Sequence, residues 1–287
     1  MKSFPKSFRT PSFLALAVAA ALAGCAATQD AGHSAMNMVK SVTGQAQVVR
    51  QDVAPALYEV AYSPSEDVVY AVSSGNPKDP ASGVKSKLFK LDPETLAVKA
   101  EIELPKPCYG LTLDDEAHRL YIVDTRGGTL MVFDTTLGQV TSSVTMPPVL
   151  DAQGKPEKIE YREIVVDKAN NRLYLPAMSY HDSKLQVVNL ETLTVERTIP
   201  GFNFGATGIS MDSGAGKLYV SNLMGQLFVV DIGTLAITDR FEVQGDQLLN
   251  LVVDHDNKRL LAVDQGFDRL NVVRKERGGL DYQPRTQ

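Results

Sequence analysis

The sequence predicts an all-β fold, a β-propeller of four-stranded blades, and two repeating blocks carry that prediction. The first block ends in Leu-Tyr or an equivalent pair and is followed each time by an apolar strand. Its last residues are Tyr70, Tyr121, Tyr174, Tyr219 and Leu261, which are 51, 53, 45 and 42 positions apart. The second block, typified by VVDIGTL at residues 229–235, recurs in step with the first. A unit of four short strands cannot bury both of its faces alone, so this repetition predicts that the units stack.

The fourth unit shows the expected strands most clearly. Short apolar stretches, separated by turn residues, predict its four strands at residues 207–211, 218–222, 227–231 and 236–243. Units two and three follow the same plan, with first strands expected at residues 109–113 and 161–166. Long stretches with helical periodicity are not evident across these units. Repeating helical architectures are therefore disfavoured.

Two sets of recurring residues have structural explanations. The aspartates of the second block, Asp92, Asp134 and Asp231, are expected to open the turn between the third and fourth strands. A carboxylate at that place can accept hydrogen bonds from backbone N–H groups. The tyrosines that end the first block are expected to pack between blades. Neither set is therefore a candidate for chemistry.

The N-terminus has the pattern of an export signal. Three basic residues precede an apolar run at residues 13–23, which is too short to span a bilayer comfortably. The run leads into LAGC at residues 22–25, which resembles the lipobox of bacterial lipoproteins, whose cysteine carries the lipid. The resemblance implies a signal peptide at residues 1–24 and lipidation of Cys25. An ordinary secretory signal that contains a cysteine is the alternative.

The rest of the chain is expected to form a tether and one domain. Residues 25–46 have the polar, small-residue composition of a linker, and the propeller domain is expected at residues 47–287. Acyl chains on Cys25 would hold the protein on a membrane without a transmembrane helix, since each buried methylene contributes about 0.8 kcal/mol. Ala26 rather than Asp follows the cysteine, and resemblance to enterobacterial lipoproteins then implies a periplasmic protein on the outer membrane.

Charge and cysteine content restrict the function further. Removal of residues 1–24 leaves 26 basic and 34 acidic residues, a net charge of −8. This acidity disfavours binding driven by bulk attraction to nucleic acid, although a local basic patch could survive it. Cys108 is the only thiol left after lipidation of Cys25, so neither an internal disulfide nor a multi-cysteine metal site can form.

The common catalytic motifs are missing. The sequence contains no G-x-S-x-G, P-loop, H-E-x-x-H or C-x-x-C motif. His118 and His255 occupy equivalent turns and are expected to be solvated, and His181 with Asp182 lies in a loop without partner ligands. No catalytic residue, metal ligand or cofactor is assigned from these patterns.

Candidate binding residues lie where the innermost strands begin. Small-molecule and peptide sites of propellers generally form there, around the mouth of the central channel. That position gives the pairs Tyr58-Glu59, Cys108-Tyr109, Arg162-Glu163, Ala206-Thr207 and Leu249-Asn250. Rings, donors and acceptors of this kind could stack on a base or a sugar. The predicted ligand-binding residues are Tyr58, Glu59, Tyr109, Arg162, Glu163, Thr207 and Asn250. The alternative is that they satisfy one another around a water-filled channel.

Several blocks together resemble a known propeller family. LYVSN at residues 218–222, VVDIGTL at 229–235 and EYREIVVDKANNRLYL at 160–175 are similar to the YVTN-repeat propellers, and most closely to the YncE-like bacterial periplasmic proteins. The resemblance covers about residues 55–271. It implies a seven-bladed ring, no established catalysis, and binding roles that include DNA.

The number of units departs from that family pattern. Five units are visible, and seven would need roughly 340 positions. We therefore expect a truncated seven-bladed ring, with a ring of fewer blades as the alternative. Residues 47–52 are expected to supply the outer strand of the last blade.

Two functional hypotheses remain. The favoured one is a monomeric, envelope-anchored, non-catalytic binding or scaffold module whose ligand is a protein, a glycan or single-stranded DNA; a protein partner is expected. The alternative is a hydrolase that resembles the gluconolactonases and holds a divalent metal at the channel mouth. Glu59, Glu163 and Asn250 would then be the ligands, and their hard oxygens suit Ca²⁺ or Mg²⁺. No aspartate is found at an inner-strand start to act as the base that metal-assisted hydrolysis requires.

Overall fold

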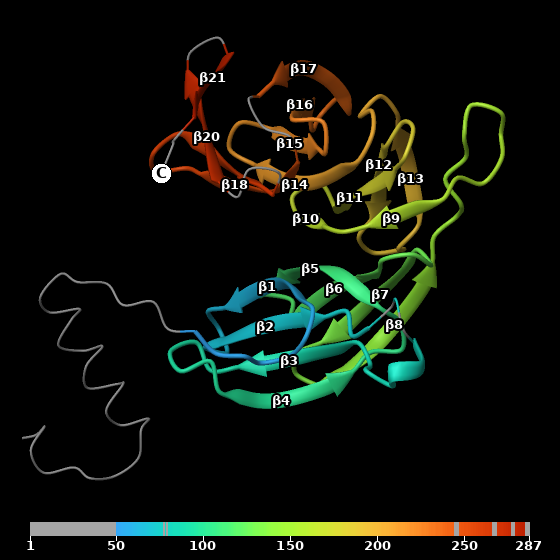
Figure 1. Cartoon of the computed structure of the whole chain (residues 1–287), viewed down its shortest axis with the longest axis vertical. Coiled ribbons are helices and arrows are strands. Elements are labelled where there is room, and N and C mark those ends of the chain that lie inside the picture. Colours follow the sequence, from blue (N-terminus) through green and yellow to red (C-terminus); the bar gives the residue numbers. More distant parts are fainter. Residues whose placement is uncertain are drawn as a thin grey trace, which may run out of the picture. The chain divides into compact units, whose positions relative to one another are not determined.

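The structure is a computed structural model, and it describes residues 50–76, 78, 80–243, 247–265, 269–276 and 279–284. The expected signal peptide, the whole of the expected tether at residues 25–46 and the expected lipidation site Cys25 lie outside this part of the chain. The chain divides into two compact units, residues 1–51 and 52–287, and the second contains all of the strands (Figure 1). In the described residues, no helix is long and apolar enough to cross a membrane.

Five antiparallel sheets follow one another along the chain, and each is a blade whose strands pair in sequence order, except that the first two short strands of the third blade both pair with its next strand. Blade 1 contains β1 (Leu57–Ser63), β2 (Val68–Ser73), β3 (Lys87–Leu91) and β4 (Val98–Glu103), with a short 3₁₀ helix (Pro80–Ser82) before β3. Blade 2 contains β5 (Cys108–Asp114), β6 (Arg119–Asp124), β7 (Thr129–Asp134) and β8 (Gln139–Thr145). Blade 3 contains β9 (Ile159–Tyr161), β10 (Val165–Asp167), β11 (Arg172–Ser179), β12 (Lys184–Asn189) and β13 (Val195–Ile199).

The last two blades repeat the same order. Blade 4 contains β14 (Ala206–Asp212), β15 (Lys217–Asn222), β16 (Gln226–Asp231) and β17 (Ala236–Glu242). Blade 5 contains β18 (Leu248–Asp254), β19 (Arg259–Asp264), β20 (Arg269–Glu276) and β21 (Gly279–Pro284). The fourth strand of blade 5 is therefore β21, which pairs with β20. The expectation that residues 47–52 supply this strand is wrong, because β21 occupies the outer edge of the blade and residues 50–52 form no strand.

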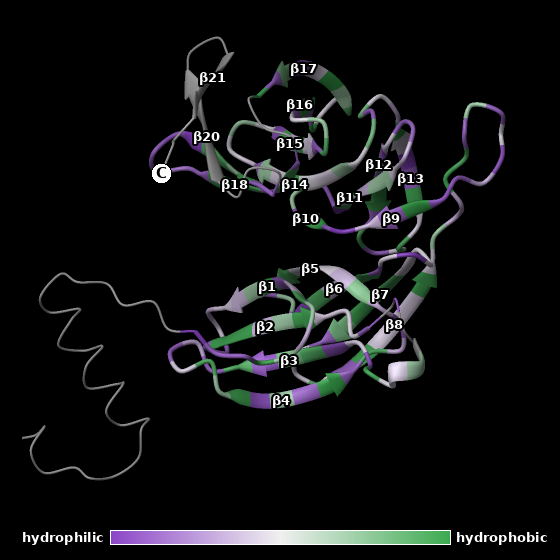
Figure 2. Cartoon of the chain, in the orientation of Figure 1, coloured by the Kyte–Doolittle hydropathy of each residue, from purple (hydrophilic) through white to green (hydrophobic). Residues whose placement is uncertain are grey.

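The apolar core lies between successive blades, as stacking requires. The recurring tyrosines contribute to it one by one: Tyr70 packs between blades 1 and 2, Tyr121 between blades 2 and 3, and Tyr174 between blades 3 and 4. Tyr219 packs between blades 4 and 5. All four side chains are at most 4% exposed. In Figure 2, β2, β6 and β7 are largely hydrophobic, whereas β4 carries hydrophilic segments.

The expected turns are confirmed. Asp92, Asp134 and Asp231 each accept backbone N–H hydrogen bonds from residues two or three positions later, between the third and fourth strands. These hydrogen bonds lower the pKa of Asp231 to about 2. His118, His181 and His255 are exposed in loops or turns. The turn aspartates stabilise the turns. Candidate functional residues are therefore sought at the start of the first strands.

Candidate ligand-binding site at the start of the inner strands

A β-bulge marks the start of the first strand in every blade. The first strands are the innermost ones, since β1 contacts β5, β10 contacts β5 and β14, and β14 contacts β18. In blades 1, 2, 4 and 5 the pairing with the second strand shifts by one residue at this point. In blade 3 the shift separates the first strand into β9 and β10, both of which pair with β11. Bulges of this kind re-aim side chains at the rims of sheets and beside sites.

The bulges define two sets of equivalent positions. The first bulge position is held by Tyr58, Tyr109, Arg162, Thr207 and Leu249, in blade order. The second is held by Glu59, Gly110, Glu163, Gly208 and Asn250. All seven predicted ligand-binding residues occupy one of these positions. The predicted pairs of blades 2 and 4 were one residue early, because the pairs equivalent to Tyr58-Glu59 are Tyr109-Gly110 and Thr207-Gly208.

Three residues of the first bulge position form an aromatic and cationic cluster. The rings of Tyr58 and Tyr109 stack with 4.3 Å between centroids and 7° between planes. The guanidinium carbon of Arg162 lies 5.7 Å from the Tyr109 ring centroid, and its Nη1 donates to the Tyr58 hydroxyl at 3.3 Å. Burial has the largest influence on the pKa of Tyr58 and raises it, so this phenol stays neutral. We call Tyr58, Tyr109 and Arg162 the platform.

Acidic and basic neighbours hold Arg162 in place. Its Nη2 donates to Glu160 Oε2 at 3.0 Å, and Arg126 Nε lies 3.7 Å from the other oxygen of Glu160. Glu160 is 9% exposed, so this carboxylate is largely withdrawn from water. The Nε of Arg162 is buried and has no hydrogen-bond partner. Sequence reasoning missed Glu160 and Arg126, although Glu160 is only two residues from Arg162.

Thr207 is placed differently from the platform residues. It is 1% exposed, and its hydroxyl donates to the backbone carbonyl of Leu248 in the next blade at 2.8 Å. The structure therefore shows Thr207 joining blades 4 and 5, and its role in binding a ligand stays a prediction.

Only three of the blades have a side chain at the second bulge position. In the other two blades, the backbone of the next blade comes close to the glycine at this position. A Cβ added to Gly208 would lie 2.3 Å from the Leu249 carbonyl oxygen of the next blade. A Cβ on Gly110 would lie 3.0 Å from the carbonyl oxygen of Arg162. The adjacent inner strand therefore leaves no room for a Cβ at Gly208 and would be in tight contact with one at Gly110.

The remaining members of that set are Glu59, Glu163 and Asn250. Asn250 Nδ2 approaches Glu59 Oε2 at 3.4 Å, and thereby links blade 5 to blade 1. Glu163 is 7% exposed, and its Oε2 accepts the backbone N–H of Ile209 at 2.7 Å. Burial raises the pKa of Glu59 to about 7. Burial, and secondly the charge of Glu59, raise the pKa of Glu163 well above its usual range.

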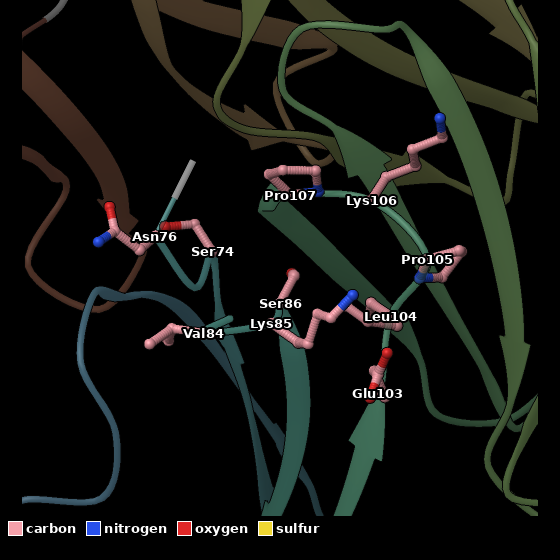
Figure 3. A pocket seen from close by; sticks show the side chains of 10 residues that line it. All are labelled: Ser74, Asn76, Val84, Lys85, Ser86, Glu103, Leu104, Pro105, Lys106 and Pro107. Atoms are coloured by element: carbon pink, nitrogen blue, oxygen red, sulfur yellow. The ribbon is translucent and has the colours of Figure 1, made fainter. Parts of the chain in front are cut away.

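A pocket of about 240 Å³ lies beside blades 1 and 2, next to the residues that lead into β5 (Figure 3). Pro107, which immediately precedes β5, forms part of its wall. Two lysines line it: Lys85 extends toward Glu103 and Leu104, whereas Lys106 extends away from them. Sequence reasoning did not find these lysines, because they lie on loops that no repeat motif marks.

Blade 3 carries a second hollow, of about 430 Å³, which His181 and Asp182 line together with Asp151 and Glu157. Glu157 is paired with Lys184 at 3.0 Å, and Asp182 accepts backbone hydrogen bonds from Gly201 and Asn203. Within the described part of the chain, no group of three or more His, Cys, Asp or Glu residues could hold a metal ion.

Comparisons with known proteins support the fold and the resemblance. No known family profile matches the chain. A YncE protein of Salmonella typhi is 27% identical over 240 residues, which are 81% of this chain and 66% of the relative. A YncE protein of Escherichia coli K12 is 26% identical over 252 residues, 85% of this chain and 69% of the relative. The chain thus spans just under two thirds of the Salmonella relative's length.

A solved structure agrees with the architecture. The β-propeller domain of Cps50 (Swd1) from Myceliophteria thermophila superposes with a TM-score of 0.56 over 80% of this chain and 68% of that one. Its sequence identity is 14%, so this likeness shows the fold alone. Five antiparallel blades, the interblade tyrosines and the similar sequences lead to one conclusion: the chain is a β-propeller that is similar to the YncE proteins.

Proposed function

We propose that this protein is a non-catalytic binding module whose ligand contacts the platform, and that the ligand is single-stranded DNA. The observation that carries the proposal is the stacked pair Tyr58 and Tyr109 with the guanidinium of Arg162 against both. Flat rings stack on any base, and an arginine beside them can engage a phosphate. We further propose that lipidation at Cys25 anchors the module to the outer membrane on the periplasmic side.

The positive charges of Arg162 and of two nearby lysines favour an anionic ligand such as DNA over a neutral glycan. The guanidinium of Arg162 lies against the two rings of the platform, and Lys85 and Lys106 line a pocket next to the strand that carries Tyr109. No ion pair is found for either lysine among the described residues, so both remain able to contact a phosphate. The acidic chain as a whole opposes an anionic ligand, so binding is expected to depend on these local cations and on salt.

The proposal is tested by titrating a fluorescently labelled single-stranded DNA with the purified mature protein at low and physiological salt. Arg162→Ala is expected to weaken binding and to reduce the salt slope by about one. Tyr109→Ala is expected to cost about 1–3 kcal/mol, the contribution of one stacked base.

Two matched variants control for the loss of a charge and of a ring. Arg197→Ala removes an exposed cation from β13 in the same blade as Arg162, and Tyr62→Ala removes a half-exposed ring at the far end of β1. Both should bind as the wild type does. Absence of binding by the wild type at low salt would reject the DNA proposal, and binding to a protein or glycan array would then identify the other ligand classes.

A further inference from the structure

Three oxygen-bearing side chains stand at one register of the inner strands in alternate blades. They are Glu59 in blade 1, Glu163 in blade 3 and Asn250 in blade 5. The intervening blades have glycine there, which leaves these side chains as the only ones at the second bulge position of the described blades. The set combines two carboxyl groups and one amide, and it contains no nitrogen or sulfur ligand of the kind that zinc or copper prefers.

One of the two carboxyl oxygens of Glu163 lacks a hydrogen-bond partner. The residue is 7% exposed, and Ile209 N–H satisfies only its Oε2. Its Oε1 is buried without any hydrogen-bond partner. A buried oxygen of this kind costs free energy unless a proton, a donor or a cation meets it.

No cationic side chain meets either carboxyl group in the described structure. The groups that act on Glu163 are its burial, the charge of Glu59 and the Ile209 N–H. Those that act on Glu59 are its burial, the Val60 N–H and Asn250. Arg162 adjoins Glu163 in the chain, but its guanidinium turns to Tyr58 and Glu160 instead.

We propose that Glu59, Glu163 and Asn250 bind one hard divalent cation, Ca²⁺, and that the amide of Asn250, whose Nδ2 faces Glu59 Oε2 at 3.4 Å, turns over so that its oxygen meets the ion. Two carboxylates carry the −2 charge that such an ion balances, and all three protein ligands are oxygens. Ca²⁺ accepts six to eight oxygen ligands in irregular geometry, so water completes the shell. Mg²⁺ fits less well, since it demands a near-ideal octahedron that ligands from three separate blades do not supply.

The bound ion would act on the fold and beside the platform. It would connect blades 1, 3 and 5, because each contributes one ligand, and the folded state would gain the binding free energy. It would also neutralise the acidic pair next to Tyr58 and Arg162, both adjacent in the chain to a ligand. The inference does not depend on what the platform binds.

The test is calorimetric titration of CaCl₂ into the chelator-treated full chain, together with thermal unfolding at several calcium concentrations. One ion per chain and a rise in Tm with calcium are expected. Glu59→Gln and Glu163→Gln should each weaken calcium binding by at least about tenfold. Glu191→Gln removes an exposed carboxylate from blade 3 and should bind calcium as the wild type does.

Three results would overturn the proposal. They are an absence of heat and of any Tm shift at millimolar calcium, unchanged affinity in the Glu59 and Glu163 variants, or equal or tighter binding of Mg²⁺. If Glu163→Gln fails to fold, the calcium affinity of Glu59→Gln, whose substituted side chain is only half-buried, still tests the proposal. Since none of these measurements uses DNA, failure here leaves the proposed function standing, and the reverse also holds.

Discussion

The raised pKa of Glu59 makes the stability of the fold depend on pH in a defined direction. Burial raises this pKa from the usual 4.5 to about 7, so the folded state holds the proton more tightly than the unfolded chain. The stabilising contribution of the neutral carboxyl is therefore fully present below pH 4.5 and is lost as the pH rises through 7. Glu59→Gln keeps the shape and the hydrogen-bonding capacity of the side chain but cannot ionise.

The size of the effect follows from the shift. One pKa unit corresponds to about 1.36 kcal/mol, so the whole shift is worth about 3 kcal/mol. Glu59 is only half-buried, and screening by solvent reduces this to about 2 kcal/mol. Between about pH 4 and about pH 8, the free energy of unfolding of Glu59→Gln should rise by that amount relative to the wild type. Glu163 and Asn250 face the same carboxyl, and neither is changed.

Urea unfolding at a series of pH values measures this difference directly. A chelator is included, so that no divalent cation pairs with the carboxylates. Glu191→Gln, an exposed carboxylate in blade 3, is the control and should follow the wild-type profile. Parallel pH profiles for Glu59→Gln and the wild type would refute the assignment of Glu59 as a buried carboxyl with a raised pKa.

Two further predictions concern packing of the blades. Gly208→Ala should destabilise the fold by about 1–3 kcal/mol, because its Cβ would lie 2.3 Å from the Leu249 carbonyl oxygen. Gly214→Ala, whose Cβ would meet no atom closer than 3.6 Å, should be nearly neutral, and equal urea midpoints for the two would contradict the close approach of blades 4 and 5. Tyr161→Phe should cost about 1–3 kcal/mol, since it deprives the buried Gln186 Oε1 of its donor; an unchanged thermal unfolding curve would show that this hydrogen bond contributes little.

The blades were predictable because each is encoded locally. Apolar alternation and an Asp-initiated turn recur in most units, so strands such as β15 and β16 were expected to within a residue or so. The interblade tyrosines also followed from the repeat, since a residue that recurs at one strand position must face the same neighbour in each copy. The fourth strand of blade 5 was assigned to the wrong segment, because residues 279–284 lack the repeat motif.

The site was predictable in position but not in detail. The tetrapeptides LYEV, CYGL and ATGI align at the bulge, and that alignment would have placed Gly110 and Gly208 opposite Glu59. The contacts could not be foreseen, because they join blades far apart in sequence. Tyr58 meets Arg162 across 104 positions, and Glu59 meets Asn250 across 191. Only the assembled inner strands bring these side chains together.

The most direct test of the platform is to locate a bound strand on it. A photoreactive single-stranded DNA is crosslinked to the mature protein, and the modified peptides are identified by mass spectrometry. The stacked geometry predicts crosslinks at Tyr58 and Tyr109, and both should decrease in Arg162→Ala, which binds the strand more weakly. Crosslinks confined to other residues, with none at these two tyrosines, would contradict the assignment of this site.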